Sequence, residues 1–275
     1  MIKTVIDSES RKVFPDFREL SKYRDLFLIL AYRDFRVRYA QTFLGLVWVF
    51  IQPLFILFIL NFVFGRAINI DTGGIPYPVF ALSGMMAWTY FSFLMSQAGQ
   101  SIINNGEMIK KIYFPRLVVP LSKGLVGLID YFMIFIFFMG MMLIYQVSPS
   151  SNIVYLPVFV LLVIFAASGI GIWLSALTIR YRDLQQVVPF LVQIGLYITP
   201  VAYPSSFVIN NLPGWAQQLY FFNPVAGIIE GIRWSVFGTP LIMERLWISV
   251  AISAVLFITS LIYFRKMELV MADLI

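Results

Sequence analysis

Cysteine and histidine are both absent from this chain of 275 residues. Without cysteine the chain can form no disulfide, no thiolate metal ligand and no thiol nucleophile, and without histidine it lacks the commonest acid–base group. No Gly-x-x-x-x-Gly-Lys-[Ser/Thr] segment occurs, which excludes a nucleotide site of the P-loop kind. Carboxylates paired for hydrolysis and clusters of metal ligands are not visible either. We therefore expect no catalytic site, no bound metal and no cofactor in this chain.

Charge is also scarce. Charged residues make up 12% of the chain and hydrophobic residues 60%, with a mean hydropathy of +0.85. A soluble domain could not bury so much apolar surface, so the composition predicts a polytopic membrane protein. The net charge of +6 lies in short segments beside apolar runs, where it sets membrane topology. We therefore expect no nucleic-acid partner.

Six apolar segments are candidates to cross a bilayer as helices. The expected spans are about 43–64, 79–103, 124–145, 153–179, 187–203 and 246–264. This arrangement places seventeen of the twenty Lys and Arg residues on one side, which is the cytoplasmic side by the positive-inside rule. The predicted fold is an all-α membrane protein with a cytoplasmic region at 1–42, a single six-helix domain at 43–264 and a cytoplasmic tail at 265–275.

Residues 17–39 have the pattern of an amphipathic helix in the cytoplasmic interface. Apolar side chains recur at three and four residues from Leu20 to Ala31, and the basic side chains lie mostly off that stripe. The basic residues assigned to this interface helix are Arg24, Arg33, Arg36 and Arg38. The pattern fits a simple topology anchor and a docking surface equally well.

The segment 104–116 is the longest predicted cytoplasmic loop after the N-terminal region, and it mixes apolar with basic side chains. Apolar anchors ringed by charge suit a docking contact with a partner, although an ordinary cytoplasmic turn is the simpler interpretation. The residues assigned to this contact are Glu107, Ile109, Lys110, Lys111, Tyr113, Phe114 and Arg116.

Residues 205–238 are apolar enough to suggest a further span, but their charges argue against one. Glu230 and Arg233 would each cost about 2.5–3.5 kcal/mol at the bilayer centre, and Asn223-Pro224 interrupts the segment. We expect short broken helices that form a re-entrant external hairpin, with Asn223, Pro224, Glu230 and Arg233 as its key residues. Glu230 and Arg233 stand three residues apart and are expected to pair along one helix face.

Asp130 is the only carboxylate well inside a predicted span. A carboxylate at such a depth is a candidate proton or sodium site. The simpler interpretation is that Asp130 pairs with a cation from a loop or with a polar group of the helix bundle.

Four segments of the chain carry a resemblance to a known family. They are Arg33-Asp-Phe-Arg-Val-Arg-Tyr-Ala-Gln-Thr-Phe-Leu-Gly-Leu-Val-Trp48 with Gln52-Pro53-Leu54, Ile109-Lys-Lys-Ile-Tyr-Phe-Pro-Arg-Leu-Val-Val-Pro-Leu121, Arg180-Tyr-Arg-Asp-Leu-Gln185 and Phe222-Asn-Pro-Val-Ala-Gly-Ile-Ile-Glu-Gly-Ile-Arg233. In this order they resemble the membrane subunit of ABC-2 type exporters that move polysaccharides, notably the O-antigen and capsule permeases and their teichoic-acid relatives.

The resemblance implies a homodimer of six-helix subunits in the bacterial inner membrane, with both termini cytoplasmic and two copies of a separate ATP-binding subunit attached. It places an interface helix at about 17–39, a coupling helix at about 104–116 and external gate helices at about 205–238. The implied substrate is a polysaccharide carried on a lipid. An ABC-2 type permease for drugs or lipids would share the fold, and an ion-coupled transporter or a membrane enzyme using Asp130 or Glu230 is a more distant alternative.

Three predicted helix faces carry aromatic rings, and the second and third also carry side-chain amides. A ring offers apolar area to the C–H face of a sugar, and an amide exchanges hydrogen bonds with hydroxyl groups. These faces are therefore expected to line a conduit, with Phe55, Phe58, Gln97, Gln193 and Tyr197 toward the lumen. The full set is Trp48, Phe55, Phe58, Phe62, Phe93, Gln97, Gln100, Gln193 and Tyr197. Since aromatic residues are 17% of the chain, packing is the simpler role for any single ring.

Overall fold

The computed structural model describes residues 14–40, 43–268 and 271. The remaining parts of the predicted cytoplasmic regions, at 1–13, 41–42, 269–270 and 272–275, lie outside the described residues. Every regular element within the described ranges is a helix, which confirms the prediction of an all-helical chain.

Five helical segments of the described chain are long and apolar enough to cross a membrane. They are Gly45–Ala67 (η2 Gly45–Val47, α3 Trp48–Leu60 and the π-helix η3 Asn61–Ala67), α4 Tyr77–Gln97, α7 Val118–Ile144, Ser151–Arg180 (η4 Ser151–Tyr155 and α8 Leu156–Arg180) and α13 Met243–Glu268. The remaining predicted span corresponds to α9, Leu184–Ile198, which has only 15 residues. At 1.5 Å per residue it is about 22 Å long, less than the roughly 30 Å of a hydrocarbon core. The chain is thus a multi-pass membrane protein, and its sixth crossing stays a prediction.

The largest differences between helix ends and predicted span ends occur in α4, α7 and α9. Helix α4 ends at Gln97, and a turn separates it from the short helix α5, Ser101–Asn104. Helix α7 begins at Val118 because Pro120 falls in its first turn, where a backbone N–H has no partner inside the helix. Helix α9 ends at Ile198, because the next residue precedes a proline and is extended, with ψ 148°.

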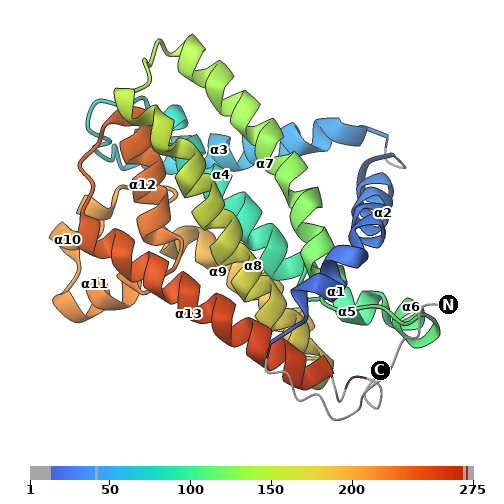
Figure 1. Ribbon diagram of the computed structural model, residues 1–275. Helices are drawn as coiled ribbons and strands as arrows, with labels where there is room; N and C mark the ends of the chain where they lie inside the picture. Colours follow the sequence, from blue (N-terminus) through green and yellow to red (C-terminus); the bar gives the residue numbers. More distant parts are fainter. Residues whose placement is uncertain (1–13, 41–42, 269–270, 272–275) are drawn as a thin grey trace.

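The long helices form a bundle with one group of short helices at each end (Figure 1). Helix α13 packs along α8, and α4 packs against both α7 and α8. The main core lies between these helices and includes Leu82, Met86, Phe138 and Ile228. The first spanning segment and α9 contribute less to this core, and they flank α4 instead.

One end of the bundle gathers the N-terminal helices and the helices after α4. Here lie α1 Phe17–Lys22, α2 Arg24–Phe35, the π-helix η1 Arg36–Ala40 and α6 Gly106–Lys111. Helix α2 lies along α7. Leu30 and Ala31 of the predicted apolar stripe are buried, and Leu20, Tyr23 and Phe27 pack partly against the core at this end. The stripe therefore faces protein, while Ile29 and Tyr32 leave a second apolar face exposed.

The opposite end carries three short helices between α9 and α13. They are α10 Ser205–Asn211, α11 Gly214–Phe221 and α12 Ala226–Phe237. This sequence of short helices agrees with the predicted broken segment over 205–238. Helix α12 is the most deeply buried of the three, because it packs against α4, α8 and α13 at once.

Candidate functional site

A first cavity of about 510 Å³ lies between the first spanning segment, α4, α7 and α9. Its lining combines aromatic rings, small hydroxyls and amides with one ion pair. The lining residues are Arg38, Tyr39, Trp48, Val49, Gln52, Pro53, Ile56, Met85, Trp88, Thr89, Ser92, Phe93, Ser96, Gln97, Asp130, Ile134, Val192, Gln193 and Leu196. Four residues of the predicted conduit are thus brought together, namely Trp48, Phe93, Gln97 and Gln193.

The first helix presents a different face to this cavity from the predicted one. Val49, Gln52 and Ile56 line the cavity together with Trp48. Phe55, Phe58 and Phe62 turn away from it and are 66%, 70% and 61% exposed on the surface of the single chain. Within one copy of the protein, the aromatic stripe of the first helix therefore belongs to the outer surface.

Helices α4 and α9 approach each other closely beside the cavity. A Cβ atom added to Gly195 of α9 would lie 2.3 Å from the Trp88 ring of α4, so only glycine fits there. Gln97 and Gln193 line the cavity from these two helices. Two other predicted conduit residues do not line it: Gln100 is half-buried in the turn after α4, and Tyr197 is exposed near the end of α9.

A second cavity of about 540 Å³ lies between α2, the end of α4, α5 and the start of α7. Its lining is more highly charged than that of the first. It consists of Arg33, Asp34, Val37, Arg38, Phe93, Gln97, Asn104, Asn105, Lys123 and Val126. The two cavities adjoin, because Arg38, Phe93 and Gln97 line both.

Arg38 and Asp130 form an ion pair where the cavities meet. Arg38 Nη2 lies 2.9 Å from Asp130 Oδ2. The Tyr39 hydroxyl donates a hydrogen bond to the same carboxylate, and the Arg38 guanidinium also lies over the Phe93 ring, 4.6 Å from its centroid. The expectation that Asp130 pairs with a cation or a polar group of the protein is confirmed, although the cation comes from the helix η1 and not from a loop. Asp130 is buried, whereas Arg38 keeps 39% of its side-chain area exposed.

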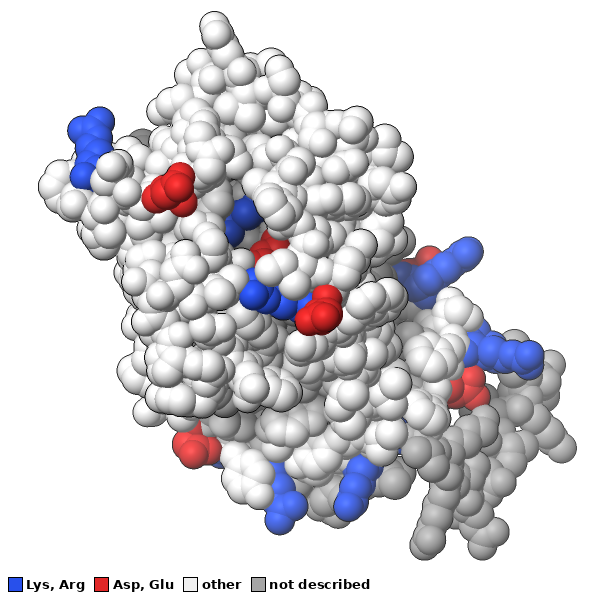
Figure 2. Space-filling model, turned by 90° about the vertical axis from the view of Figure 1, so that its left-hand side faces the viewer, with Lys and Arg blue, Asp and Glu red and all other residues white. Residues whose placement is uncertain are grey.

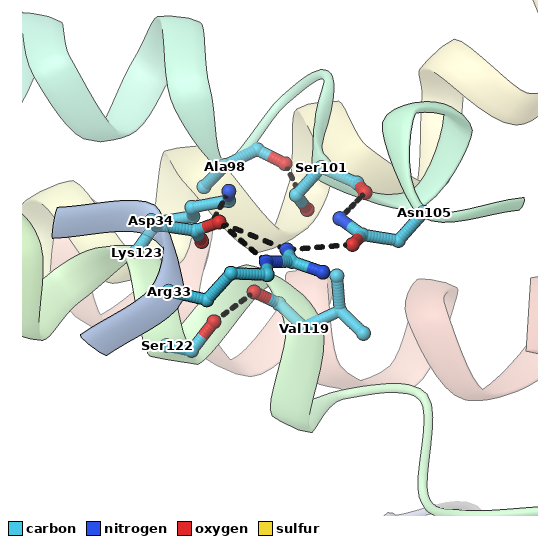
Figure 3. A network of polar contacts seen from close by, with 8 residues as sticks. All are labelled: Arg33, Asp34, Ala98, Ser101, Asn105, Val119, Ser122 and Lys123. Carbon is cyan, nitrogen blue, oxygen red and sulfur yellow. Dashed lines mark hydrogen bonds and ion pairs between the residues drawn. The ribbon is translucent and has the colours of Figure 1, made fainter. Parts of the chain in front are cut away.

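A second group of charges lies around Asp34, in the wall of the second cavity (Figure 3). Lys123 Nζ is 2.5 Å from Asp34 Oδ2, and Arg33 Nη2 is 2.8 Å from Asp34 Oδ1. Arg33 also donates to the side-chain oxygen of Asn105 at 2.8 Å. Lys123 is buried, although the predicted spans placed it just outside the membrane. Its aspartate partner explains how α7 accommodates it, since a buried charge needs a counter-charge.

The predicted coupling segment divides into a buried and an exposed part. Phe114 is 5% exposed and packs in the core with Leu30 and Phe264. Its assignment to a docking surface is wrong for this structure. Tyr113 is 71% exposed and Ile112 is 60% exposed.

The charged residues of the same segment fall into two sets. Glu107 and Lys111 form an exposed pair at 3.5 Å on α6, where Ile109 and Lys110 also lie. Arg116 is tied to the last helix, because its Nη1 donates to the Glu268 carbonyl at 2.6 Å. The start of α7 is thereby fixed to the end of α13.

The charged residues of the segment 205–238, which was predicted to form an external hairpin, have other partners than the predicted ones. The expected pairing of Glu230 with Arg233 is wrong, because Glu230 Oε1 lies 4.0 Å from Arg245 Nη1 of α13 instead. Arg233 donates to the carbonyl of Val201 at 3.0 Å and to Ser83 Oγ at 3.3 Å. In Figure 2, which faces this side, charged groups are few and a small group of both signs lies in a hollow.

Burial changes the acid–base properties of these two groups on α12, which is not one of the five candidate spans. It raises the pKa of Glu230 to about 7, against the opposing effect of Arg245. Burial also lowers the pKa of Arg233 to about 10, so this side chain stays cationic at neutral pH. Asn223 closes the turn before the helix, accepting from the Val225 N–H at 3.0 Å and donating to Thr199 Oγ1 at 2.8 Å, with Pro224 inside the turn.

Sequence reasoning missed part of the first cavity, although a signal for it was present. On α4, Thr89, Ser92, Phe93, Ser96 and Gln97 recur at three and four residues, which places a polar stripe on one face of an apolar span. Gln52 inside the first span is a similar signal. The role of Arg38 in the cavity depends on the contact of η1 with Asp130 of α7, which no sequence pattern indicates.

The two adjoining cavities combine polar side chains with aromatic rings. Among the residues that the structure describes, no three His, Cys, Asp or Glu side chains lie close enough to hold a metal ion. The two carboxylates of the cavities are each engaged by a cation at 2.5–2.9 Å. The rings and amides of this lining offer apolar contacts and hydrogen bonds to a ligand that carries hydroxyl groups.

The chain is similar in sequence to known membrane transporters. A family model described as ABC-2 type transporter matches residues 25–237. The chain is 26% identical over 253 residues to an O-antigen export system permease protein RfbA of Klebsiella pneumoniae, covering 91% of this chain and 95% of that protein. It is 28% identical over 193 residues to RfbA of Myxococcus xanthus, with 70% and 73% covered. It is 22% identical over 208 residues to the polysialic acid transport protein KpsM of Escherichia coli, with 75% and 79% covered.

Proposed function

Because this chain belongs to the ABC-2 type transporter family, we propose that it is the permease subunit of an ATP-driven exporter of a polysaccharide. The substrate in this proposal is a lipid-linked glycan, moved from the cytoplasm across the bacterial inner membrane. The names of the relatives support this class of substrate, since they export O-antigen or polysialic acid.

The observation that carries the proposal is the pair of adjoining cavities with rings and amides on their walls. Trp48, Trp88 and Phe93 offer flat apolar surfaces, and Gln52, Gln97 and Gln193 offer amides. Sugars combine C–H faces with hydroxyl groups, so this lining matches a neutral polymer better than a small cation. The one full charge pair of the first cavity, Arg38 with Asp130, is internally neutralised.

We further propose that α9 completes six crossings and that both termini are cytoplasmic. Helix α9 is short, but neighbouring protein can form hydrogen bonds with the backbone at its ends. Arg180 and Arg182 precede it, and the positive-inside rule assigns them to the cytoplasm. The exposed apolar face of α2, with Ile29 and Tyr32, suits contact with membrane lipid in the interface. The external helices α10–α12 form the proposed re-entrant hairpin.

The proposed assembly is a homodimer with two ATP-binding subunits. The chain has no P-loop, so ATP hydrolysis must be supplied by a partner. Exposed Ile112 and Tyr113 beside Lys110 and Lys111 offer a docking contact for that partner. The exposed rings of Phe55 and Phe58 lie on the outer surface of one copy, so in this proposal they reach a conduit only if a second copy closes it.

Reconstitution in proteoliposomes tests the function directly. We expect ATP-dependent movement of the lipid-linked glycan only when the cognate ATPase subunit is present, and none with a subunit whose P-loop lysine is replaced. Transport driven by an ion gradient without that subunit would contradict the proposal, and so would ATP-driven transport of a drug-like compound with no effect on the glycan.

The conduit is tested by single cysteines in this naturally cysteine-free chain. Q97C and Q193C should react with a water-soluble thiol reagent during turnover, whereas I136C, at an exposed position in the middle part of α7, is the matched control and should not. Labelling of I136C together with protection of both glutamine positions would show that the passage lies elsewhere.

A further inference from the structure

The strongest unassigned feature is the charge on the wall of the second cavity. Three cations, Arg33, Arg38 and Lys123, line it together with Asp34. Asp130 reaches Arg38 from the neighbouring cavity. Among the described residues that line the two cavities, the cations therefore exceed the carboxylates by one positive charge.

The excess positive charge of the second cavity is not needed to pass a neutral sugar. A conduit for a neutral polymer requires no cation, and burying Lys123 beside Arg33 and Arg38 is costly without anions. The two carboxylates meet part of that need, with contacts of 2.5 Å from Lys123 and 2.9 Å from Arg38. An anionic ligand in the cavity would meet the rest.

The arginines are placed to accept such a ligand. Arg33 and Arg38 keep 44% and 39% of their side-chain area exposed, while the carboxylates that they contact are nearly buried. Both guanidinium groups border the same cavity. A planar guanidinium matches the oxygen geometry of a phosphate as well as that of a carboxylate, so a phosphate can compete with Asp130 for Arg38.

We propose that the second cavity binds the phosphate that joins the carrier lipid to the glycan, with Arg33 and Arg38 as its main ligands and Asp130 as the internal group that it displaces. This inference rests on the proposed function, because it assigns a subsite to the lipid-linked substrate. Lys123 keeps its ion pair with Asp34 and attracts the phosphate through its positive charge without contacting it.

The displacement of Asp130 from Arg38 takes place where the two cavities meet. Arg38 lies over Phe93 at the border of the two cavities. A phosphate bound by Arg38 places the sugar attached to it next to Phe93 and Gln97, at the entrance to the first cavity. When Arg38 leaves Asp130, the ion pair at that border opens. A glycan without a phosphate would leave the pair closed.

The test measures binding of farnesyl diphosphate, used as the probe, to the full chain in phosphatidylcholine nanodiscs. R38Q should weaken binding about tenfold or more, because it removes a charge-assisted contact. D130N should instead tighten binding roughly threefold or more, because it removes the competing anion. R33Q should weaken binding without touching the Arg38 pair, and R182Q, at an exposed loop position, is the matched control that should change nothing.

The opposite effects expected for R38Q and D130N distinguish a ligand-binding role of the Arg38–Asp130 pair from a structural role. A D130N variant that binds more weakly would mean that the ion pair only holds η1 against α7, and unchanged binding by both R38Q and R33Q would place the site elsewhere. Either result overturns the proposal. Gel filtration of each variant checks that it is folded, and R33Q keeps the test decisive if R38Q is not.

Three competitors identify the source of the phosphate. Inorganic diphosphate should compete and farnesol should not, because the contact is with the anion. Phosphatidylglycerol that competes as well as farnesyl diphosphate would assign the cavity to membrane phospholipid and overturn the carrier assignment. Export by the wild type in proteoliposomes tests the proposed function separately. If the wild type exports the glycan and R38Q binds the probe normally, only the phosphate site is refuted. If the wild type exports nothing although the ATPase subunit is present, the proposed function is refuted.

Discussion

The two ends of the molecule bury charge in different ways. At the end near α2, the charged groups meet in close ion pairs, with Lys123 to Asp34 at 2.5 Å and Arg38 to Asp130 at 2.9 Å. At the end near α12, Glu230 and Arg245 are 4.0 Å apart, and the facing atoms Oε1 and Nη1 have no hydrogen-bond partner among the described groups. Arg233 there relies on backbone oxygen and the Phe80 ring instead.

This difference separates charges that can be exchanged from charges that fix the fold. The pairs near α2 border cavities, so a ligand can reach their cations. Arg233 is fully enclosed, and its guanidinium connects α12 to the chain after α9 and to α4. We infer that the first set serves ligand binding and that the second holds the external helices in place.

The largest effect is expected for R233A. The change leaves the Val201 carbonyl and Ser83 hydroxyl without their donor and removes a cation 3.7 Å from the centroid of the Phe80 ring. Loss of a buried, hydrogen-bonded charge costs about 3–5 kcal/mol, so the thermal midpoint in detergent should fall sharply. R66A, an exposed arginine on η3 at the same end, is the matched control. Equal melting of both variants would contradict the anchoring role.

A comparable but smaller loss is expected for F114A at the other end. Phe114 is 5% exposed in a core that joins α2, α7 and α13, so truncation should cost about 3 kcal/mol. Y113A should leave stability within about 0.5 kcal/mol, because its ring is 71% exposed. If Tyr113 is a docking residue, Y113A uncouples ATP hydrolysis from export in a chain that melts normally. Normal export by Y113A would refute that role.

The acidity of Glu230 gives a third, pH-dependent prediction. Burial raises its pKa from 4.5 to about 7, so between these values the folded chain binds more protons than the unfolded chain. Stability should therefore fall, by about 1–3 kcal/mol, as the pH rises through about 7. E230Q should remove this slope, and E244Q, at an exposed site beside Arg245, should keep it. Melting curves from about pH 5 to about pH 8 measure the slope, and a slope retained in E230Q would place its origin elsewhere.

The sequence predicted the helical bundle well because long apolar runs leave few other folds in a membrane. Hydropathy identified the segments that became α4, α7, α8 and α13, but it could not place the end of α4 at Gln97, since the following turn carries no charge. The short external helices were also predictable, because Asn223-Pro224 and the charges of 230–233 exclude a simple span.

The site was less predictable because it depends on packing between helices. Phe55, Phe58 and Trp48 share a helical spacing, yet only Trp48 lines the cavity. Hydropathy also cannot distinguish buried Phe114 from its exposed neighbour Tyr113. The spacing of Glu230 and Arg233 showed only that they could touch, and Arg245, which lies fifteen positions farther along the chain from Glu230, takes the contact instead.

The smallest effect is expected for E107Q, which breaks a charge pair on the solvent-exposed surface. Glu107 and Lys111 pair at 3.5 Å with 82% and 73% of their side chains exposed. An exposed pair four residues apart on a helix contributes only about 0.2–0.5 kcal/mol, and salt screens most of that. E107Q should therefore melt within about 1 °C of the wild type in high salt. It also frees Lys111, so the affinity for the ATPase subunit should change at low salt if α6 is the docking contact. K22Q, on exposed α1, is the matched control. A salt-independent loss of stability in E107Q would mean that this exposed pair supports the fold as the enclosed Arg233 does, and access from solvent or from a cavity would then no longer distinguish exchangeable charges from structural ones.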